Sequence, residues 1–245
     1  VLGAAPEADP RIVVVDIDQK SLAELGRWPW SRRTHAQLVD RLTMAEAKGI
    51  AFNILLSEPA LFDPEGDALL ARAIGRSGRV VLPVLAESVQ LNGPSVELMP
   101  IPEFAASAAS LGHAEMVLDD DGVARSVYLR AVLGSPHWPA LALALLQLDQ
   151  PPGTATELPG RRRVKTELPA ASPFDWVRDH EVLVPFTSPP NAFRHVSYTD
   201  VLNQRIPSSL LRGNWVVVGV NATGMGPLAR APGQPPTASM SGAEY

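Results

Sequence analysis

Acidic and amide side chains follow the ends of three apolar runs in this sequence. Asp16 and Asp18 close the run RIVVVDID, Asn53 and Glu58 lie within and just after GIAFNILL, and Asn221 follows WVVVG. Apolar runs of this length predict strands buried on both faces of a parallel sheet. Ligands bind beyond the carboxyl ends of such strands. We therefore expect these side chains either to converge on one crevice or to cap helices and satisfy loop backbone.

The pair Asp16 and Asp18 also allows an enzymatic interpretation. A strand ending in Asp-x-Asp resembles the start of haloacid dehalogenase-like phosphatases, in which the first Asp attacks phosphorus and the second acts as general acid. However, Lys20 stands where that family has Thr or Val, and the acidic pair Asp120 and Asp121 precedes an apolar run rather than a helix. A phosphatase using Asp16 and Asp18 is therefore the alternative hypothesis.

Two tryptophans flank a proline in the segment Trp28-Pro29-Trp30. The indole rings form a stiff apolar platform, and their N–H groups need partners if they are buried. This platform is either a ligand wall or dimer contact, or a plug beneath the first helix. The candidate ligand-binding residues are Asp16, Asp18, Trp28, Trp30, Arg32, Asn53, Glu58 and Asn221.

Composition argues against metal, cofactor and nucleic-acid sites. The chain has no cysteine, and its five histidines show no i, i+4 pairing, so we expect no metal site. The run DDDG at 119–122 resembles a fragment of a calcium loop but lacks the ligating Glu, and it favours a hairpin turn. The net charge of -5 disfavours nucleic acid. No nucleotide-binding glycine motif is present, and we expect no cofactor.

The order of elements predicts an α/β fold with a mostly parallel sheet and helices on both faces. Apolar runs at 11–18, 49–56 and 79–86 alternate with helical patterns at 32–47 and 67–76, as in βαβ units. Apolar runs at 112–118 and 125–133 flank the DDDG turn and predict an antiparallel hairpin extension. We expect one domain over 1–245, with a loop-rich excursion at 150–181, where Pro, Gly and charge are frequent.

The chain has no stretch that could span a membrane by sequence. Its longest strongly apolar run, 138–146, is far shorter than the roughly 20 residues a span needs. The sequence begins without Met and stops without a clear ending, so we expect that it is part of a longer polypeptide.

Most of the chain resembles the second type of CHASE domain, the cyclase- and histidine-kinase-associated sensory extracellular domain. The similar stretches include IVVVDIDQKSLAELGRWPWSR, IAFNILLSEP, LGHAEMVLDDDGVARSVYL and VSYTDVLNQRIPSSLLRGNWVVVGVNATGMG. The resemblance implies a sensor without catalytic activity on the periplasmic or extracytoplasmic face of the bacterial cell membrane. Its partners would be flanking transmembrane helices and an output domain of the same polypeptide, a cyclase or kinase, together with an unknown small-molecule ligand and a second copy in a homodimer.

The sequence departs from this family in three places. Asn53 stands where the family usually has Asp, Pro227 interrupts a loop that usually contains Asp, and Met240-Ser241-Gly242-Ala243 replaces the usual Met-Pro-Gly-Val. These departures suggest a different ligand, or a domain that transmits a signal without binding one.

Overall fold

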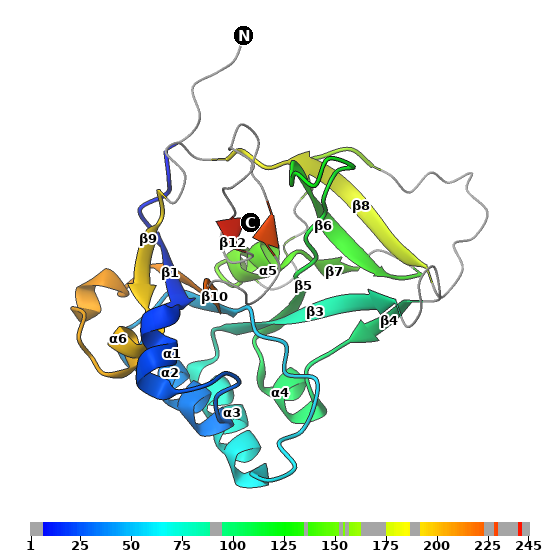
Figure 1. Cartoon of the computed structure of the whole chain (residues 1–245). Helices are drawn as coiled ribbons and strands as arrows, with labels where there is room; N and C mark the ends of the chain where they lie inside the picture. The colour runs from blue at the N-terminus through cyan, green and yellow to red at the C-terminus, as the bar shows by residue number, and fades with distance from the viewer. Residues whose placement is uncertain are drawn as a thin grey trace.

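Six parallel strands form the central sheet of the computed structural model, which describes residues 7–88, 95–134, 137–151, 154, 157–162, 175–186, 192–222, 228–229 and 240–241 (Figure 1). The strands of this sheet are β1 (Ile12–Ile17), β2 (Gly49–Phe52), β3 (Val80–Ser88), β5 (Ser110–His113), β9 (Arg194–Ser197) and β10 (Trp215–Val220), with β4 (Ser95–Leu98) added antiparallel to β3. The order along the sheet is β4-β3-β2-β10-β1-β9, and β5 also pairs with β3. The predicted mostly parallel α/β sheet is confirmed.

Side chains of β1 and its neighbours alternate between two buried faces. Val13, Val15 and Ile17 belong to the main core, whereas Ile12 packs against a smaller cluster on the other face that contains Trp215. This alternation follows from the two-residue period of a strand. Because both faces must be covered, β1 and β10 are rich in Val.

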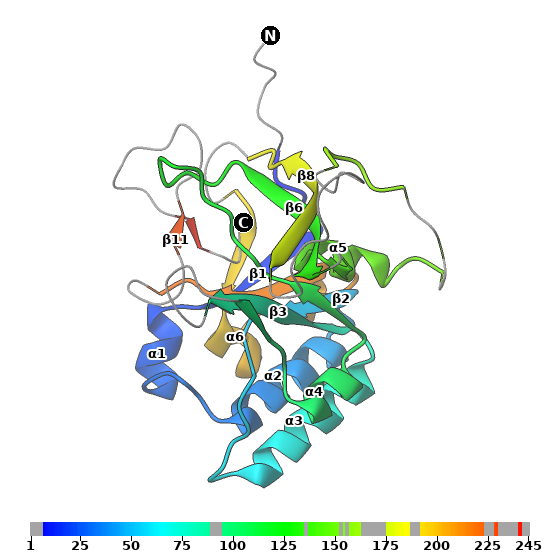
Figure 2. The same cartoon turned by 90° about the vertical axis from the view of Figure 1, so that its right-hand side faces the viewer.

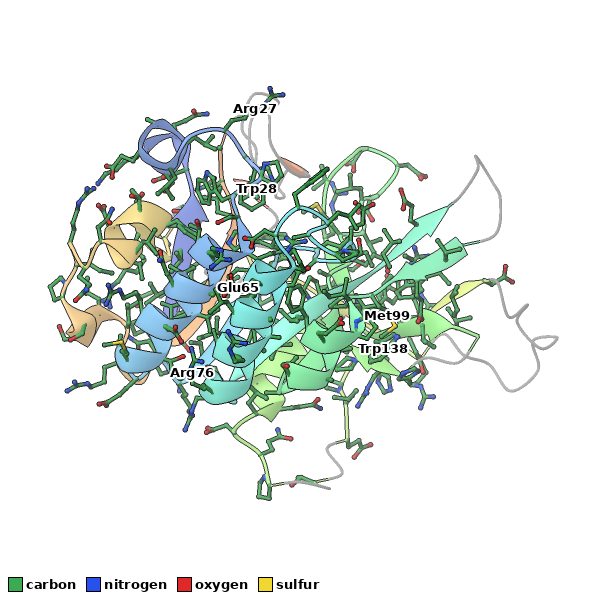
Figure 3. The ribbon with its side chains drawn as sticks, turned by 90° about the horizontal axis from the view of Figure 1, so that it is seen from below. Arg27, Trp28, Glu65, Arg76, Met99 and Trp138 are labelled. Atoms are coloured by element: carbon green, nitrogen blue, oxygen red, sulfur yellow. The ribbon has the colours of Figure 1, made fainter. Side chains whose placement is uncertain are left out.

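Five helices cover one face of the sheet (Figure 2). They are α1 (Gln19–Leu25), α2 (Arg32–Met44), α3 (Pro64–Ser77), α4 (Pro102–Ser107) and α6 (Tyr198–Leu202). The two longest, α2 and α3, lie side by side, and Arg76 near the end of α3 reaches Asp40 of α2 with an Nη2–Oδ1 distance of 2.8 Å (Figure 3). A short 3-10 helix, Ser208–Leu210, follows α6.

The opposite face carries α5 (Leu141–Gln147) and a small antiparallel sheet, as Figure 2 shows. The small sheet has the order β7-β6-β8, from β6 (Ser126–Leu133), β7 (Trp138–Pro139) and β8 (Trp176–Leu183). Helices therefore occupy both faces, as predicted, although unequally. A separate two-stranded sheet joins β11 (Leu228–Ala229) to β12 (Met240–Ser241).

Two glutamates join the small sheet to the central one. Glu97 of β4 accepts hydrogen bonds from the Leu133 amide at 3.1 Å and from Trp138 Nε1 at 3.2 Å. Glu115, just after β5, accepts from Trp176 Nε1 at 2.9 Å and binds the Arg178 guanidinium through both oxygens. Each carboxylate thus accepts an indole N–H from the small sheet.

The strands on either side of the DDDG turn do not pair with each other, so the predicted hairpin is wrong in its pairing. The turn forms, with the Gly122 amide 2.8 Å from the Asp119 carbonyl oxygen. However, β5 ends at His113 and pairs in parallel with β3, while β6 pairs with β8 over seven residue pairs. β5 therefore pairs with β3 rather than with β6, and β6 pairs antiparallel with β8 instead.

Other boundaries also differ from the sequence prediction. Neither β4 nor β9 was predicted, and β8 lies largely inside the excursion predicted at 150–181. Within that stretch, 152–153, 155–156 and 163–174 lie outside the described residues. Among the helices that the structure describes, none combines the length and apolar character needed to cross a bilayer.

Gly112 is the point where β5 and α5 come closest. A Cβ placed on Gly112 would lie 2.8 Å from the Leu141 Cα, which is backbone and unable to rotate away. We expect Gly112→Ala to lower the free energy of unfolding by about 1–3 kcal/mol because the layers must separate. Urea denaturation measures this change.

The matched control is Gly75→Ala, in the last turn of α3. The nearest atom to its added Cβ is 3.9 Å away, so nothing has to move. We expect this variant to be more stable by roughly 0.5–1 kcal/mol from helix propensity. Equal effects of the two substitutions would contradict the close approach at Gly112.

Candidate functional site

Asp16 lies near the carboxyl end of β1 and links the strands on its two sides, β9 and β10. The residue is 5 % exposed. Its Oδ2 lies 2.8 Å from His195 Nδ1 on β9, and its Oδ1 accepts from Asn221 Nδ2, after β10, at 3.1 Å. A carboxylate oxygen accepts, so the His195 ring carries its proton on Nδ1. The structure brings Asp16 and Asn221 together, as one of the two alternatives for these strand ends allowed, whereas His195 was missed because β9 was not predicted.

Asp18 acts as the N-cap of α1. Its Oδ1 accepts from the Ser21 amide at 2.7 Å and from Ser197 Oγ at 2.9 Å. The Ser21 and Ser197 hydroxyls are themselves 3.0 Å apart. The side chain therefore satisfies a helix terminus and fixes α1 to β9, which is the capping alternative considered for this set.

Trp28 and Trp30 belong to an aromatic cluster between α2 and α6. The Trp28–Pro29 peptide is cis, and the two indoles meet edge to face with ring centroids 5.2 Å apart. Trp30 is buried, donates from Nε1 to the Gly26 carbonyl at 2.9 Å, and lies 4.8 Å from the Tyr198 ring. Trp30 thus fills the core beneath α1. Trp28 also lines a cavity on the opposite face of the central sheet, which is described below.

His35 is a buried titratable group of this aromatic cluster. It is 1 % exposed, and its Nδ1 lies 2.8 Å from the Tyr198 hydroxyl oxygen. Burial, and secondarily the nearby positive charge of Arg32, lowers the pKa of His35 to about 3. The ring is therefore neutral in the folded protein at ordinary pH.

Arg32 and Glu58 hold a loop rather than facing a common crevice. Arg32 Nε lies 3.2 Å from Asp67 Oδ1, and its Nη2 donates to the Glu58 backbone carbonyl at 2.9 Å. Asp67 Oδ2 also accepts from the Ala60 amide at 2.7 Å. The contact at Glu58 involves its backbone, and the arrangement fixes the segment between β2 and α3.

A cavity of about 740 Å³ lies on the face of the central sheet that carries α5, and we call it the interlayer cavity. Its lining includes Ala51 of β2, Val217 of β10, Leu141 and Leu145 of α5, and Val127 of β6. Val217 is only partly buried although β10 lies in the middle of the sheet. The volume falls within the range of about 300–1,000 Å³ that is typical of small-molecule sites.

Trp28 and Asn53 are the two sequence-selected residues that line the interlayer cavity. The other six hold strand ends, helix caps and loops as described above. The crevice considered for Asp16, Asp18, Asn53, Glu58 and Asn221 does not gather all five residues, because Asn53 lines the cavity while the other four make the separate structural contacts described above. No sequence signal pointed to α5 and β6 as cavity walls, because their packing depends on the pairing of β6 with β8.

The polar groups of the interlayer cavity are few. Among its described lining residues, Glu115 alone carries a formal charge, and it is paired with Arg178. His113, at the end of β5, is 2 % exposed. Desolvation by burial is the largest influence on its pKa and lowers it to about 4, so the imidazole is neutral near pH 7.

The part of the chain that the structure describes contains no group of three or more His, Cys, Asp or Glu side chains placed to hold a metal ion. The acidic turn illustrates this, because Asp119 and Asp121 both bind Arg125, at 2.6 and 2.7 Å. The Arg125 guanidinium occupies the place that a cation would need.

Comparison with known protein families identifies the family of this chain. The model of the CHASE2 domain matches residues 2–245. The chain belongs to the CHASE2 domain family. CHASE2 domains are extracellular sensory domains found in receptors, so the resemblance noted in the sequence is confirmed. No curated protein and no solved structure matches the chain.

We expect Asp16→Ala to destabilise this CHASE2 domain by about 1–3 kcal/mol, because the substitution removes a buried carboxylate that accepts hydrogen bonds from both His195 and Asn221. Thermal or urea unfolding measures the loss. Asp120→Ala is the control, since Asp120 is exposed in the DDDG turn, and we expect a change within about 0.5 kcal/mol. A loss no larger than that of the control would contradict a stabilising role for Asp16.

The pKa of His35 predicts a pH dependence of stability. Its folded-state pKa of about 3 lies below the ordinary value of 6.5, so on acidification the unfolded chain takes up a proton that the folded chain refuses. Between pH 6 and pH 4 this lowers the free energy of unfolding by about 1.4 kcal/mol per pH unit. We expect His35→Gln to remove this contribution, so that its stability falls less steeply than the wild type in urea titrations. Parallel pH profiles would show that the buried ring is not responsible.

Proposed function

We propose that this CHASE2 domain is the extracytoplasmic sensor of a transmembrane bacterial receptor and that its stimulus is a small molecule bound in the interlayer cavity. The single observation that carries the proposal is this cavity of about 740 Å³, which is bordered by the central sheet, α5 and the small sheet. A sensor needs a place where a ligand meets two parts of the fold that can move relative to each other. Trp28 and Asn53 serve here as ligand contacts.

The mechanism is a shift between two arrangements of the layers. The described hydrogen bonds between the central and small sheets include those of Glu97 and Glu115, which are few compared with the strand pairing inside each sheet. A ligand that fits better in one spacing of the layers favours that spacing. It shifts the balance only by the difference between its affinities for the two states.

The signal then passes to segments outside this chain. Flanking transmembrane helices carry it to an output domain of the same polypeptide, which is a diguanylate cyclase, an adenylate cyclase or a kinase. A homodimer of the sensor allows a change in one protomer to alter the spacing of two such helices. These partners are proposed from the family, whose members occur in receptors.

The proposed domain performs no reaction of its own. In the phosphatase alternative, Asp16 would have to attack phosphorus, but both of its oxygens already interact with His195 and Asn221. Asp18, the required general acid, accepts two hydrogen bonds as the cap of α1. These contacts favour positioning roles for both carboxylates.

The experiment uses the parent polypeptide that contains this chain. Alkaline phosphatase, which needs an oxidising compartment for its disulfides, is fused after Tyr245, with β-galactosidase at the same point as the matched control. We expect activity from the first fusion and none from the second. In membranes with the intact receptor, Val217→Phe, which places a larger ring in the cavity, should change cyclase or kinase output.

The reverse pattern of fusion activity would place the domain in the cytoplasm and overturn the proposal. So would magnesium-dependent hydrolysis of para-nitrophenyl phosphate by the purified chain that Asp16→Asn abolishes. An output that is unaffected by Val217→Phe, in a receptor with correct topology, would show that the stimulus acts elsewhere.

A further inference from the structure

The walls of the interlayer cavity present hydrocarbon to a ligand. Leu141 and Leu145 line it from α5, and Ala51 and Val217 line it from the central sheet. The ring nitrogens of His113 are buried, so that a ligand cannot reach them. An apolar ligand surface gains free energy from burial against these walls, whereas a charged group would lose its hydration there.

The interlayer cavity follows β10 along its whole length. Trp215 and Val220, the first and last residues of that strand, both line it, as does Val217 between them. At about 3.3 Å per residue, the distance from Trp215 to Val220 is roughly 17 Å. An extended chain of about twelve carbons, with bonds of about 1.5 Å, has a similar length together with its head group. The cavity is therefore long enough to hold an alkyl chain that lies along the strand.

The entrance to the interlayer cavity lies beside α5. Ala142 and Leu146 line the cavity and are exposed, Leu146 to 53 %. The two residues are four positions apart and therefore lie on the same face of the helix. They form an apolar rim, along which an alkyl chain can enter while keeping apolar contact.

Lys48 places a positive charge near this entrance. Its Nζ lies 4.7 Å from the centre of the Trp215 ring and 2.7 Å from Oδ2 of Asp149, which follows α5. Both members of this ion pair are partly exposed, so the pair is weak, and the ammonium has three N–H donors to share. Glu115 lies at the other end of the cavity, after the carboxyl end of β5. An anionic head group is therefore favoured at the Lys48 end and disfavoured at the Glu115 end.

We propose that the interlayer cavity binds a single-chain anionic amphiphile, with its alkyl chain along β10 and its head group at Lys48. A free fatty acid and an anionic lysolipid share this chemistry, and the test distinguishes them. This inference rests on the proposed function, because it names the ligand class of the same cavity.

The test is isothermal titration calorimetry of the purified chain at pH 7, with each ligand below the concentration at which it forms micelles. The ligands are dodecanoate, dodecylamine, which is protonated at this pH, butanoate, and lauroyl-lysophosphatidylglycerol. We expect saturable binding of dodecanoate and none of butanoate, because the short chain buries little surface. The wild type should prefer dodecanoate over dodecylamine by about three- to tenfold, the size of exposed charge interactions.

Two variants separate the head group from the chain. Lys48→Gln should lower the preference for dodecanoate to about one while both dodecyl ligands still bind. Lys20→Gln is its matched control, because Lys20 forms a similar ion pair with Asp200, at 2.6 Å, and does not line the cavity. Val217→Phe fills the cavity and should weaken both ligands. Leu183→Phe, a similar enlargement at an exposed strand position outside the cavity, should bind both like the wild type.

Binding of dodecanoate supports a free fatty acid as the ligand, and binding of the lysolipid alone supports the lipid source. Absence of saturable binding of both would overturn the inference. So would butanoate binding as tightly as dodecanoate, an unchanged preference in Lys48→Gln, or undiminished binding by Val217→Phe.

The reporter fusions and the receptor output of Val217→Phe do not depend on the charge of the head group. The inference can therefore fail while those experiments still support a sensor with another ligand. Conversely, the fusions can fail while the purified chain still binds dodecanoate.

Discussion

A parallel sheet made of Val and Ile must be kept from water on both of its faces, and this constraint organises the whole molecule. One face is covered efficiently by five helices, which pack the main core around residues such as Leu38, Leu42 and Phe52. Among the described residues, the other face is covered mainly by α5 and a three-stranded sheet. Val217 in the middle strand remains partly accessible on this face, where it lines an apolar cavity.

The same constraint explains the polar contacts that hold the second cover in place. Glu97 and Glu115 stand near the edge of the central sheet, where β3 pairs with β4 and β5. Each uses a carboxylate to accept an indole N–H from the small sheet. Hydrogen bonds to charged acceptors are stronger and more directional than apolar contacts, so they fix the orientation of the cover without filling the space beneath it.

Local patterns in the sequence predicted the elements whose formation depends on neighbouring residues. The buried strands β1, β2, β3 and β10 and the helices α2 and α3 follow from continuous apolar runs, periodicity and breaking glycines. The short strands β4 and β9 have no such pattern, because their backbones are ordered by pairing with β3 and β1. The partner of β6 could not be predicted from the DDDG turn, since the choice between β5 and β8 depends on residues 43 to 57 positions away, from the pair Leu133 and Trp176 to the pair Ser126 and Leu183.

The residues of the candidate site divide in the same way, into those that local sequence patterns indicate and those that tertiary packing places. The strand ends indicated that Asp16 and Asn221 could lie together, and a hydrogen bond joins them. His195 could be found only by knowing that β9 lies beside β1. His113 gives no local signal at all, because its isolation depends on α5 and β8 closing over it. Residues placed by tertiary packing are thus the ones that sequence patterns leave out.

The position of β10 between β1 and β2 has a consequence for biosynthesis. β1 and β2 are the first strands to be synthesised, and they have no hydrogen bonds to each other. Both pair with β10, which begins at Trp215. A nascent chain shorter than that has two unprotected edges and no continuous sheet. Such long-range pairing makes folding slow, so the central sheet can close only after most of the chain has been synthesised.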